Sequence, residues 1–188
     1  IKILIADDHV LFREGMESLL KNHADFEIAG SASDGREAVA LARSLQPDLV
    51  LMDVTMPNLN GILATAQITA EQPHTAVIVL SMHSDRRFIA ETLKAGARGY
   101  LLKESSSQTV IEAIHSVMGG EIYLSDKACT VLVEDYLRLL GSESADKTNP
   151  LSEREMEVLL LLVKGRNGKQ IADTLSISKN TVDTHRRR

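Results

Sequence analysis

At four places along the chain, a short apolar run ends in residues that could do chemistry. These residues are Asp7 and Asp8, Asp53, Ser81 and Lys103. The preceding runs are rich in Val, Ile and Leu, which is typical of strands buried on both faces of a parallel sheet. In open α/β sheets, ligands bind just beyond the carboxyl ends of the strands. The pattern therefore predicts one site that gathers three carboxylates, a hydroxyl and an ammonium group.

Three neighbouring carboxylates suit a hard divalent cation such as Mg2+, which binds through one or two carboxylates, waters and phosphate oxygens. Bunched carboxylates repel one another, so the metal ion or Lys103 is needed to keep them ionised together. Asp53 could then attack a phosphorus atom and form an acyl phosphate. Mg2+ and Lys103 would neutralise the oxygens of the transferring group, and Ser81 could donate a hydrogen bond to it.

A simpler interpretation is that Asp7, Asp8 and Ser81 cap the helices that follow their strands. Three separate caps would not explain why Lys103 stands at the fourth strand end, so we favour a shared site. His83, two residues after Ser81, is interpreted as a solvated loop histidine.

The elements that position these residues alternate between strand and helix. The predicted strands cover residues 2–6, 27–31, 49–52, 76–80 and 99–102. The predicted helices cover residues 10–22, 35–44, 62–71, 86–94 and 107–118. Strand–helix units of this length imply right-handed crossovers between parallel strands. The predicted fold is α/β, with a doubly wound, five-stranded parallel sheet.

The rest of the chain is predicted to be helical. A helix over residues 126–140 is followed by small polar residues at 141–149, which we interpret as a flexible linker. Beyond it come three short helices, the second at residues 169–175, with a tight turn before the third, a pattern typical of a helix-turn-helix. The predicted domains are residues 1–120, a linker region at 121–150 and an all-α domain at 151–188.

Composition is that of an ordinary soluble globular protein, with 44% apolar and 25% charged residues. No apolar run is long enough to span a bilayer, and the N-terminus has no signal-peptide pattern. The single Cys129 cannot form an internal disulfide, and with these features it favours a reduced, cytoplasmic protein.

The net charge of −5 is distributed unevenly. Residues 1–150 hold 13 Lys and Arg against 21 Asp and Glu, whereas residues 151–188 hold 8 against 5. An acidic part followed by a basic part suggests two tasks, the second on a polyanion.

Residues 1–120 resemble the receiver domain of bacterial two-component response regulators, which has a flavodoxin-like fold. The motifs that carry the resemblance are Asp7-Asp8, Asp53 with Met56-Pro57 and Gly61, Ser81, Ala95-Gly96-Ala97, Tyr100 and Lys103. The resemblance implies that Asp53 is the phosphoacceptor and that Lys103 pairs with the phosphoryl group. The Mg2+ ligands that it implies are Asp8, Asp53 and the Thr55 backbone carbonyl, with Asp7 acting through water.

The same resemblance implies a switch made of Ser81 and Tyr100. When Ser81 moves toward the phosphoryl group, we expect Tyr100 to rotate inward from an outward position. The chain departs from many receivers at Glu104, where they have a proline in a cis peptide. No cis peptide is therefore expected after Lys103.

The C-terminal part resembles the effector domain of the NarL/FixJ (LuxR-type) regulators. The motifs are Leu151-Ser152-Glu153-Arg154-Glu155, Val158-Leu159, Gly165, Lys169-Gln170-Ile171-Ala172, Leu175-Ser176-Ile177-Ser178, Thr181-Val182 and His185. By this resemblance, the base-contacting residues are Asp183, Thr184 and Arg187. The phosphate-contacting residues are Lys179, Thr181 and Arg186. The family's domain continues into a fourth helix, so we expect this one to be incomplete at its C-terminus.

Together these features predict a phosphorylation-activated, DNA-binding transcriptional regulator and not an enzyme. The expected partners are a sensor histidine kinase, an operator in double-stranded DNA and, after phosphorylation, a second copy of the chain; no membrane is expected. Two alternatives were weighed. A phosphohydrolase would need an acid–base residue and a substrate pocket, and neither pattern is found. A regulator that is never phosphorylated would be indicated by loss of Asp8, Asp53 or Lys103, and all three are present.

Overall fold

The computed structural model describes residues 1–146, 158, 161, 168–175, 177 and 181. The chain divides into two compact units, Ile1–Tyr136 and Leu137–Arg188. Within the described residues, no helix combines the length and apolar character needed to cross a membrane.

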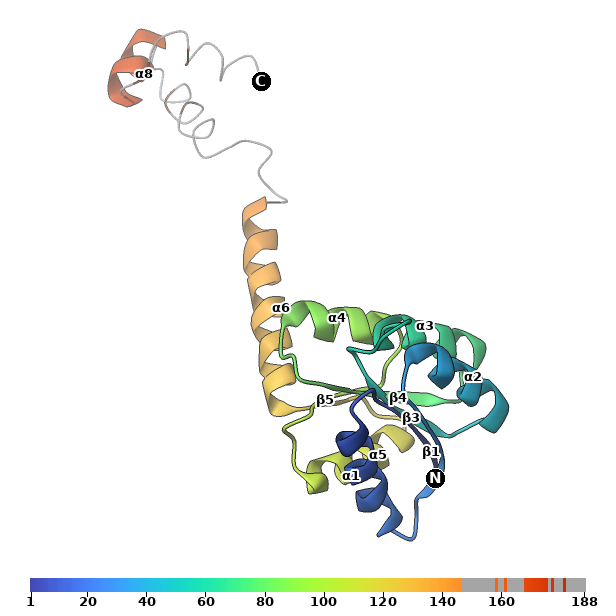
Figure 1. Ribbon diagram of the computed structural model, residues 1–188. Coiled ribbons are helices and arrows are strands. Elements are labelled where there is room, and N and C mark those ends of the chain that lie inside the picture. Colours follow the sequence, from blue (N-terminus) through green and yellow to red (C-terminus); the bar gives the residue numbers. More distant parts are fainter. Residues whose placement is uncertain (147–157, 159–160, 162–167, 176, 178–180, 182–188) are drawn as a thin grey trace. The chain divides into compact units, whose positions relative to one another are not determined.

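The first unit is built on a parallel sheet with the strand order β2-β1-β3-β4-β5-β6 (Figure 1). The strands are β1 (Lys2–Ala6), β2 (Glu27–Ala32), β3 (Leu49–Asp53), β4 (Ala76–Ser81), β5 (Gly99–Leu102) and β6 (Tyr123–Leu124). The first five lie where the sequence predicts them. Since β1 lies between β2 and β3, the strand order reverses there, and such reversals are where open α/β sheets bind ligands.

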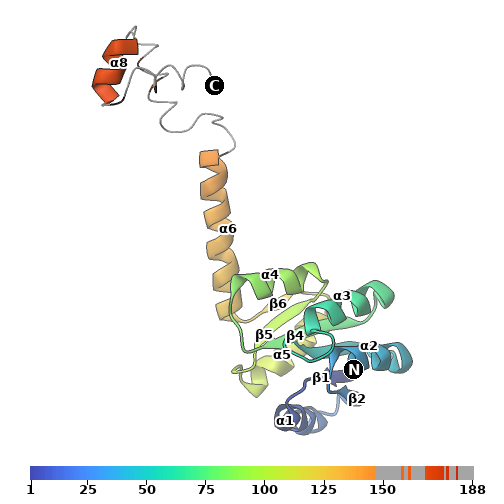
Figure 2. The same ribbon diagram turned by 45° about the horizontal axis from the view of Figure 1, so that its top comes forward.

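The prediction of five strands was wrong by one, because β6 adds a sixth. It pairs in parallel with β5, with Gly99 opposite Tyr123, and so lies at one edge of the sheet (Figure 2). A strand of two half-buried residues has neither an apolar run nor a visible alternation. It forms because the chain leaving α5 (Ser107–Met118) passes the open edge of β5 and supplies hydrogen bonds to it.

Helices cover both faces of the sheet (Figure 1). The remaining helices of this unit are α1 (Val10–Lys21), α2 (Gly35–Leu45), α3 (Gly61–Glu71) and α4 (Arg86–Lys94). Side chains of α1 and α5, such as Leu20 and Ile114, are buried in the core on one face. Side chains of α2, α3 and α4, such as Ile68 and Ile89, are buried in the core on the other face. The sheet therefore contributes to two apolar cores, as a doubly wound fold requires.

Local sequence fixes where several helices begin. Asp34, Asn60 and Ser106 each accept a hydrogen bond in their side chain from the backbone N–H three residues later. These bonds satisfy donors that a helix otherwise leaves unpaired at its start. The helix α4 ends at Lys94, and the turn after it contains Gly96, whose φ of +98° favours glycine. The Thr69 hydroxyl donates a hydrogen bond to the Ala95 carbonyl in this turn.

The long helix α6 (Asp126–Asp146) extends beyond the predicted end at residue 140. The interpretation of residues 141–149 as a flexible linker is therefore wrong for residues 141–146, while 147–149 lie outside the described residues. One internal glycine, Gly141, costs only about 1 kcal/mol relative to alanine. Continuing an established helix does not repeat the cost of nucleation, so the small polar residues after it can remain helical.

In the second unit, α8 (Gly168–Leu175) matches the short helix predicted at residues 169–175. Its Ile171 and Ala172 are buried with Val158 in a small core. The Ile177 N–H donates to the Ala172 carbonyl, which closes the turn after α8.

Candidate phosphorylation and metal site

The ends of β1, β3 and β5 meet at one buried ion-pair cluster. The ammonium of Lys103 lies 2.7 Å from Asp7 Oδ2 and 2.9 Å from Asp53 Oδ2. All three side chains are almost entirely buried, with exposed fractions of 6% or less. One cation between two buried carboxylates offsets their mutual repulsion. The structure thus brings together Asp7, Asp53 and Lys103, three of the five residues that the strand-end pattern predicts to share one site.

Asp53 lies at the end of β3 beneath the start of α3. A Cβ atom added to Gly61 would lie 1.8 Å from the Asp53 carbonyl oxygen, so only glycine fits at this close approach. Burial raises the pKa of Asp53 above its ordinary value. Lys103 and the Thr55 backbone N–H act in the opposite direction, while the negative charge of Asp7 adds to the rise. The Asp53 carboxylate is thus largely shielded from water and lies beside the Lys103 ammonium.

Asp7 and Asp8 follow β1 side by side but differ in environment. Asp7 is buried, and its backbone carbonyl accepts a hydrogen bond from the Arg13 guanidinium of α1. Asp8 is exposed, and one of its carboxylate oxygens lies in the same group as ligand atoms of Asp7 and Asp53. The roles predicted for them, with Asp8 as a direct ligand of the ion and Asp7 acting through water, stay predictions.

His9 is a member of this cluster that the sequence interpretation missed. Its Nδ1 lies 2.9 Å from Asp8 Oδ1 and 3.2 Å from Asp7 Oδ1. Its position directly after Asp7-Asp8 was the available signal.

The residues present fit a divalent cation. One ligand atom each from Asp7, Asp8, His9 and Asp53 can be chosen so that all lie within 4.8 Å of one another. Among the described residues, the ion pairs with Lys103 are the only contacts found for the buried Oδ2 atoms of Asp7 and Asp53. A set rich in carboxylate oxygens is the chemistry that Mg2+ prefers. This acidic pocket is consistent with Mg2+ binding.

Ser81 and Tyr100 lie together behind the site. Ser81 Oγ accepts a hydrogen bond of 3.0 Å from the His83 N–H, and the Lys103 N–H donates to the Ser81 carbonyl. Tyr100 is fully buried, and its hydroxyl donates to the His83 carbonyl at 2.8 Å. Burial raises the pKa of Tyr100, partly offset by its hydrogen bond to Ser81.

The expectation that Tyr100 points outward is therefore wrong for this structure. The ring already fills the inward position, and the loop after β4 closes around its hydroxyl. His83 is exposed as predicted, but its ring also stacks on Phe88 of α4, with ring centroids 4.8 Å apart. The stacking holds the loop over Tyr100, which local sequence alone could not indicate.

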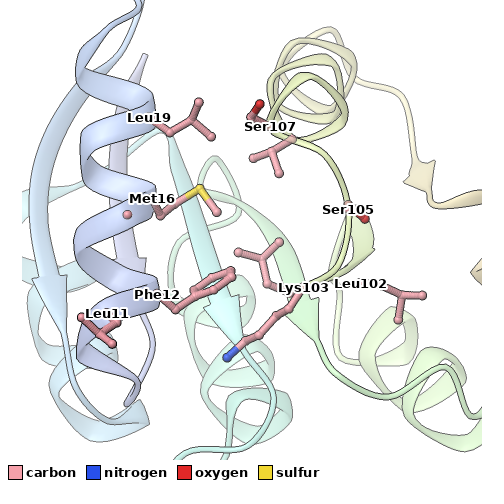
Figure 3. Close-up of a pocket in the computed structure, with 11 residues that line it drawn as sticks. Leu11, Phe12, Met16, Leu19, Leu102, Lys103, Ser105 and Ser107 are labelled. Carbon is pink, nitrogen blue, oxygen red and sulfur yellow. The ribbon is translucent and has the colours of Figure 1, made fainter.

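A pocket of about 350 Å³ lies beside Lys103, between α1 and α5 (Figure 3). Its walls are mainly apolar, with Phe12, Met16 and Leu19 contributed by α1. The Lys103 ammonium lies 4.7 Å from the centre of the Phe12 ring, a cation–π contact. The Phe12 ring therefore contacts the same ammonium that pairs with Asp7 and Asp53.

The peptide bond between Lys103 and Glu104 is trans, as expected where glutamate stands in place of proline. The described backbone contains no cis peptide bond. Glu104 is exposed and lies 3.5 Å from the Lys127 ammonium of α6. Such a surface pair contributes little to stability.

Of the predicted DNA-contacting residues, the structure describes Thr181 alone, which is helical and exposed. Five others lie outside the described residues, namely Lys179, Asp183, Thr184, Arg186 and Arg187. Their contacts remain predictions.

Comparisons with known proteins identify the two parts of the chain. Residues 3–115 match the response regulator receiver domain, and residues 149–188 match the bacterial regulatory proteins of the luxR family. The chain therefore belongs to the two-component response regulators of the LuxR type, in which a receiver is followed by a helix-turn-helix domain. Its function is phosphorylation-dependent regulation of transcription, and such proteins are transcription factors rather than classical enzymes.

Individual relatives agree with this assignment. The chain is 37% identical to the transcriptional regulatory protein DegU of Brevibacillus brevis, over 98% of this chain and 84% of that protein. It is 36% identical to the oxygen regulatory protein NreC of Staphylococcus carnosus, over 99% and 88% respectively. A solved LuxR-family response regulator from Aurantimonas sp. SI85-9A1 superposes with a TM-score of 0.69 and 30% identity, covering 72% of this chain and 97% of that one. The receiver implies a histidine kinase as partner, and the luxR-type domain implies DNA binding.

Proposed function

We propose that Asp53 accepts a phosphoryl group from a sensor histidine kinase and that this modification raises affinity for an operator. The observation that carries the proposal is the position of Lys103, whose ammonium bridges Asp7 and Asp53 in a buried site. A buried cation beside the acceptor carboxylate can pass from the carboxylate to the incoming phosphoryl oxygens.

In the proposed reaction, an Asp53 oxygen attacks phosphorus while the bond from phosphorus to the donor histidine nitrogen breaks. The product is an acyl phosphate on Asp53 and a free imidazole on the kinase. Lys103 stabilises negative charge on the phosphoryl oxygens, and the Ser81 hydroxyl donates a hydrogen bond to one of them.

Mg2+ would be held by Asp8, Asp53 and the Thr55 backbone carbonyl, with Asp7 acting through water. The ion supplies charge neutralisation to the transferring group. Slow loss of the phosphoryl group to water would be the chain's own reaction, together with self-phosphorylation from small donors. No further catalytic activity is proposed.

In this proposal, residues 1–120 are the receiver domain that is phosphorylated, and residues 151–188 are the domain that binds DNA. Residues 121–150 link the two domains. Lys179, Thr181 and Arg186 would contact DNA phosphates, and Asp183, Thr184 and Arg187 would face the bases. Phosphorylation would favour a homodimer, which suits the two half-sites common in operators. A DNA-binding regulator acts where the chromosome is, so we place it in the cytoplasm.

The test is modification with a small phosphodonor, followed by borohydride trapping and mass spectrometry. We expect label on Asp53 in the wild-type protein only when Mg2+ is present. Label at wild-type levels in Asp53→Asn would refute the assignment, and label without Mg2+ would refute the metal's role.

A further inference from the structure

The helix α6 is apolar on two faces, and only one of them packs on the receiver. Ala128 is fully buried in the core that α4 also covers, and Val131 and Leu132 pack against that core (Figures 1 and 2). A helix that only covers a domain needs one apolar stripe, and the rest of its surface can be polar. The second apolar face of α6 therefore indicates a further partner.

This second face is formed by Cys129, Val133 and Tyr136, which we call the outer stripe of α6. Cys129 is exposed, and the exposed fractions of Val133 and Tyr136 are 51% and 62%. The three residues follow one another at steps of four and three, and in the sequence the next step of four reaches Leu140. Contiguous apolar residues exposed in this way mark interaction surfaces.

We propose that the outer stripe is the surface through which two copies of the chain pair, as a short parallel coiled coil of two α6 helices. This inference rests on the homodimer of the proposed function and names the surface that forms it.

The spacing of the outer stripe favours a second copy of the chain over an unrelated partner. Alternating steps of four and three residues give the 3.5-residue repeat of a coiled coil. A helix with this repeat is complementary to its own copy, because the same positions meet across a twofold axis. The 21 residues of α6 span about three heptads, or about 30 Å. A seam of this length is small, which suits association that phosphorylation switches on.

The distribution of charge supports the same partner. Residues 1–150 hold 13 Lys and Arg against 21 Asp and Glu, so two copies carry like net charge in this part of the chain. Between Cys129 and Tyr136 the only charged residues are Glu134 and Asp135, and neither falls on the spacing of the outer stripe. Two acidic chains can therefore meet at the outer stripe without placing like charges opposite each other.

The parallel arrangement follows from the order of the chain. Residues 151–188, which are proposed to bind DNA, follow α6 in both copies. Parallel helices lead both copies of this segment away from the same end of the seam, as two neighbouring operator half-sites require. In this arrangement, Cys129 of each copy faces its counterpart across the twofold axis.

The inner face of α6 connects the outer stripe to the proposed switch. Tyr100 is buried in the same core as Ala128. A rearrangement at Tyr100 therefore changes the surface on which α6 rests, and in this way phosphorylation can alter the pairing of α6 helices.

Disulfide trapping of the full chain tests the surface, because Cys129 is its single cysteine. The protein is treated with a small phosphodonor and Mg2+ and then with the thiol oxidant diamide, and linked dimer is measured on a non-reducing gel. The matched control is Cys129→Ser combined with Glu134→Cys, which moves the thiol to an exposed position on another side of the same helix. We expect about 10-fold more linked dimer from wild type than from this control, since thiols held opposite each other have a high effective concentration.

Val133→Lys gives an independent measurement, because Val133 is exposed and its replacement leaves the receiver core intact. Sedimentation of the phosphorylated protein should show a dimer dissociation constant raised about 10-fold or more, because each copy would place a charge in the seam. Glu134→Lys is the matched control, and it should dimerise as wild type does.

A phosphorylated dimer that is unchanged by Val133→Lys, or equal linking in wild type and the control with the moved cysteine, would overturn the inference. So would a wild-type protein that stays monomeric after labelling at Asp53, which would leave the outer stripe to a different partner. Linking that does not depend on the phosphodonor would support the surface and contradict control of the dimer by phosphorylation. The acceptor role of Asp53 is tested separately by Mg2+-dependent labelling, which can succeed when this inference fails.

Discussion

The hydroxyl of Tyr100 donates a 2.8 Å hydrogen bond to the backbone carbonyl of His83, in the loop that also binds Ser81. The His83 backbone thereby connects the buried Tyr100 on β5 to the Ser81 hydroxyl, which is proposed to bind the phosphoryl group. The His83 ring stacks on Phe88 and closes this loop against α4. A change at Ser81 would therefore reach the surface formed by α4 and β5 through contacts already in place.

Tyr100→Phe tests this connection while it keeps the aromatic ring. We expect the free energy of unfolding to fall by about 1 kcal/mol, since the partly buried hydrogen bond to the His83 carbonyl is lost. Urea denaturation measures the change. Labelling of Asp53 should be unaffected, so a large loss of phosphorylation would contradict a role limited to the switch.

The variant Ser81→Ala tests whether phosphorylation of Asp53 and the rise in operator affinity can be separated. The variant should accept the phosphoryl group on Asp53 but lose most of the rise in operator affinity, because the group that follows the phosphoryl oxygens is absent. Labelling and DNA titration of the same preparation measure both steps. Should the variant gain affinity as fully as wild type, the switch lies elsewhere.

Asp8→Ala and Asp7→Ala should affect metal binding unequally. Loss of a direct ligand leaves the ion short of charge, whereas water can replace part of an indirect one. We expect the larger loss of Mg2+ affinity in Asp8→Ala and the larger loss of thermal stability in Asp7→Ala, because Asp7 is buried against Lys103. Equal Mg2+ affinities of the two variants would argue against these roles.

Asp53→Asn should stabilise the metal-free protein at neutral pH. Burial raises the pKa of Asp53 in the folded protein above its ordinary value of 3.8, so the folded state binds the proton more tightly than the unfolded chain does. The contribution of Asp53 to stability is therefore present below pH 3.8 and is lost as pH rises through its raised folded-state pKa. The side-chain amide of the Asp53→Asn variant does not ionise, so the variant does not lose this stability. Thermal unfolding should show a gain at pH 7 that disappears below about pH 3.8. A destabilised variant at pH 7 would mean that the pairing with Lys103 outweighs burial.

Gly61→Ala should destabilise the receiver by about 1–3 kcal/mol, because its Cβ would overlap the Asp53 carbonyl. The control is Gly15→Ala in α1, where nothing lies within 4 Å of an added Cβ. That change should stabilise by about 0.5–1 kcal/mol, since alanine is the better helix former. Similar unfolding midpoints for the two variants would contradict the close packing at Asp53.

The ion-pair cluster could be predicted from sequence because the topology of a parallel sheet brings the ends of its strands together. Buried apolar runs that end in Asp53 and Lys103 can belong only to strands that finish at the same edge of a parallel sheet. What was missed depends on tertiary contacts. The strand β6 forms through the neighbouring edge of β5, and the inward position of Tyr100 depends on a loop held by the stacking of His83 on Phe88.

Operator affinity with and without phosphorylation tests the central claim most directly. The DNA is an operator found by genome-wide footprinting, and the proteins are wild type and Asp53→Asn, each with and without a small phosphodonor and Mg2+. We predict that the donor raises wild-type affinity and leaves Asp53→Asn unchanged, with affinity falling steeply as salt increases. An equal rise in both proteins, or none in a wild-type protein shown to carry the phosphoryl group, would contradict the account.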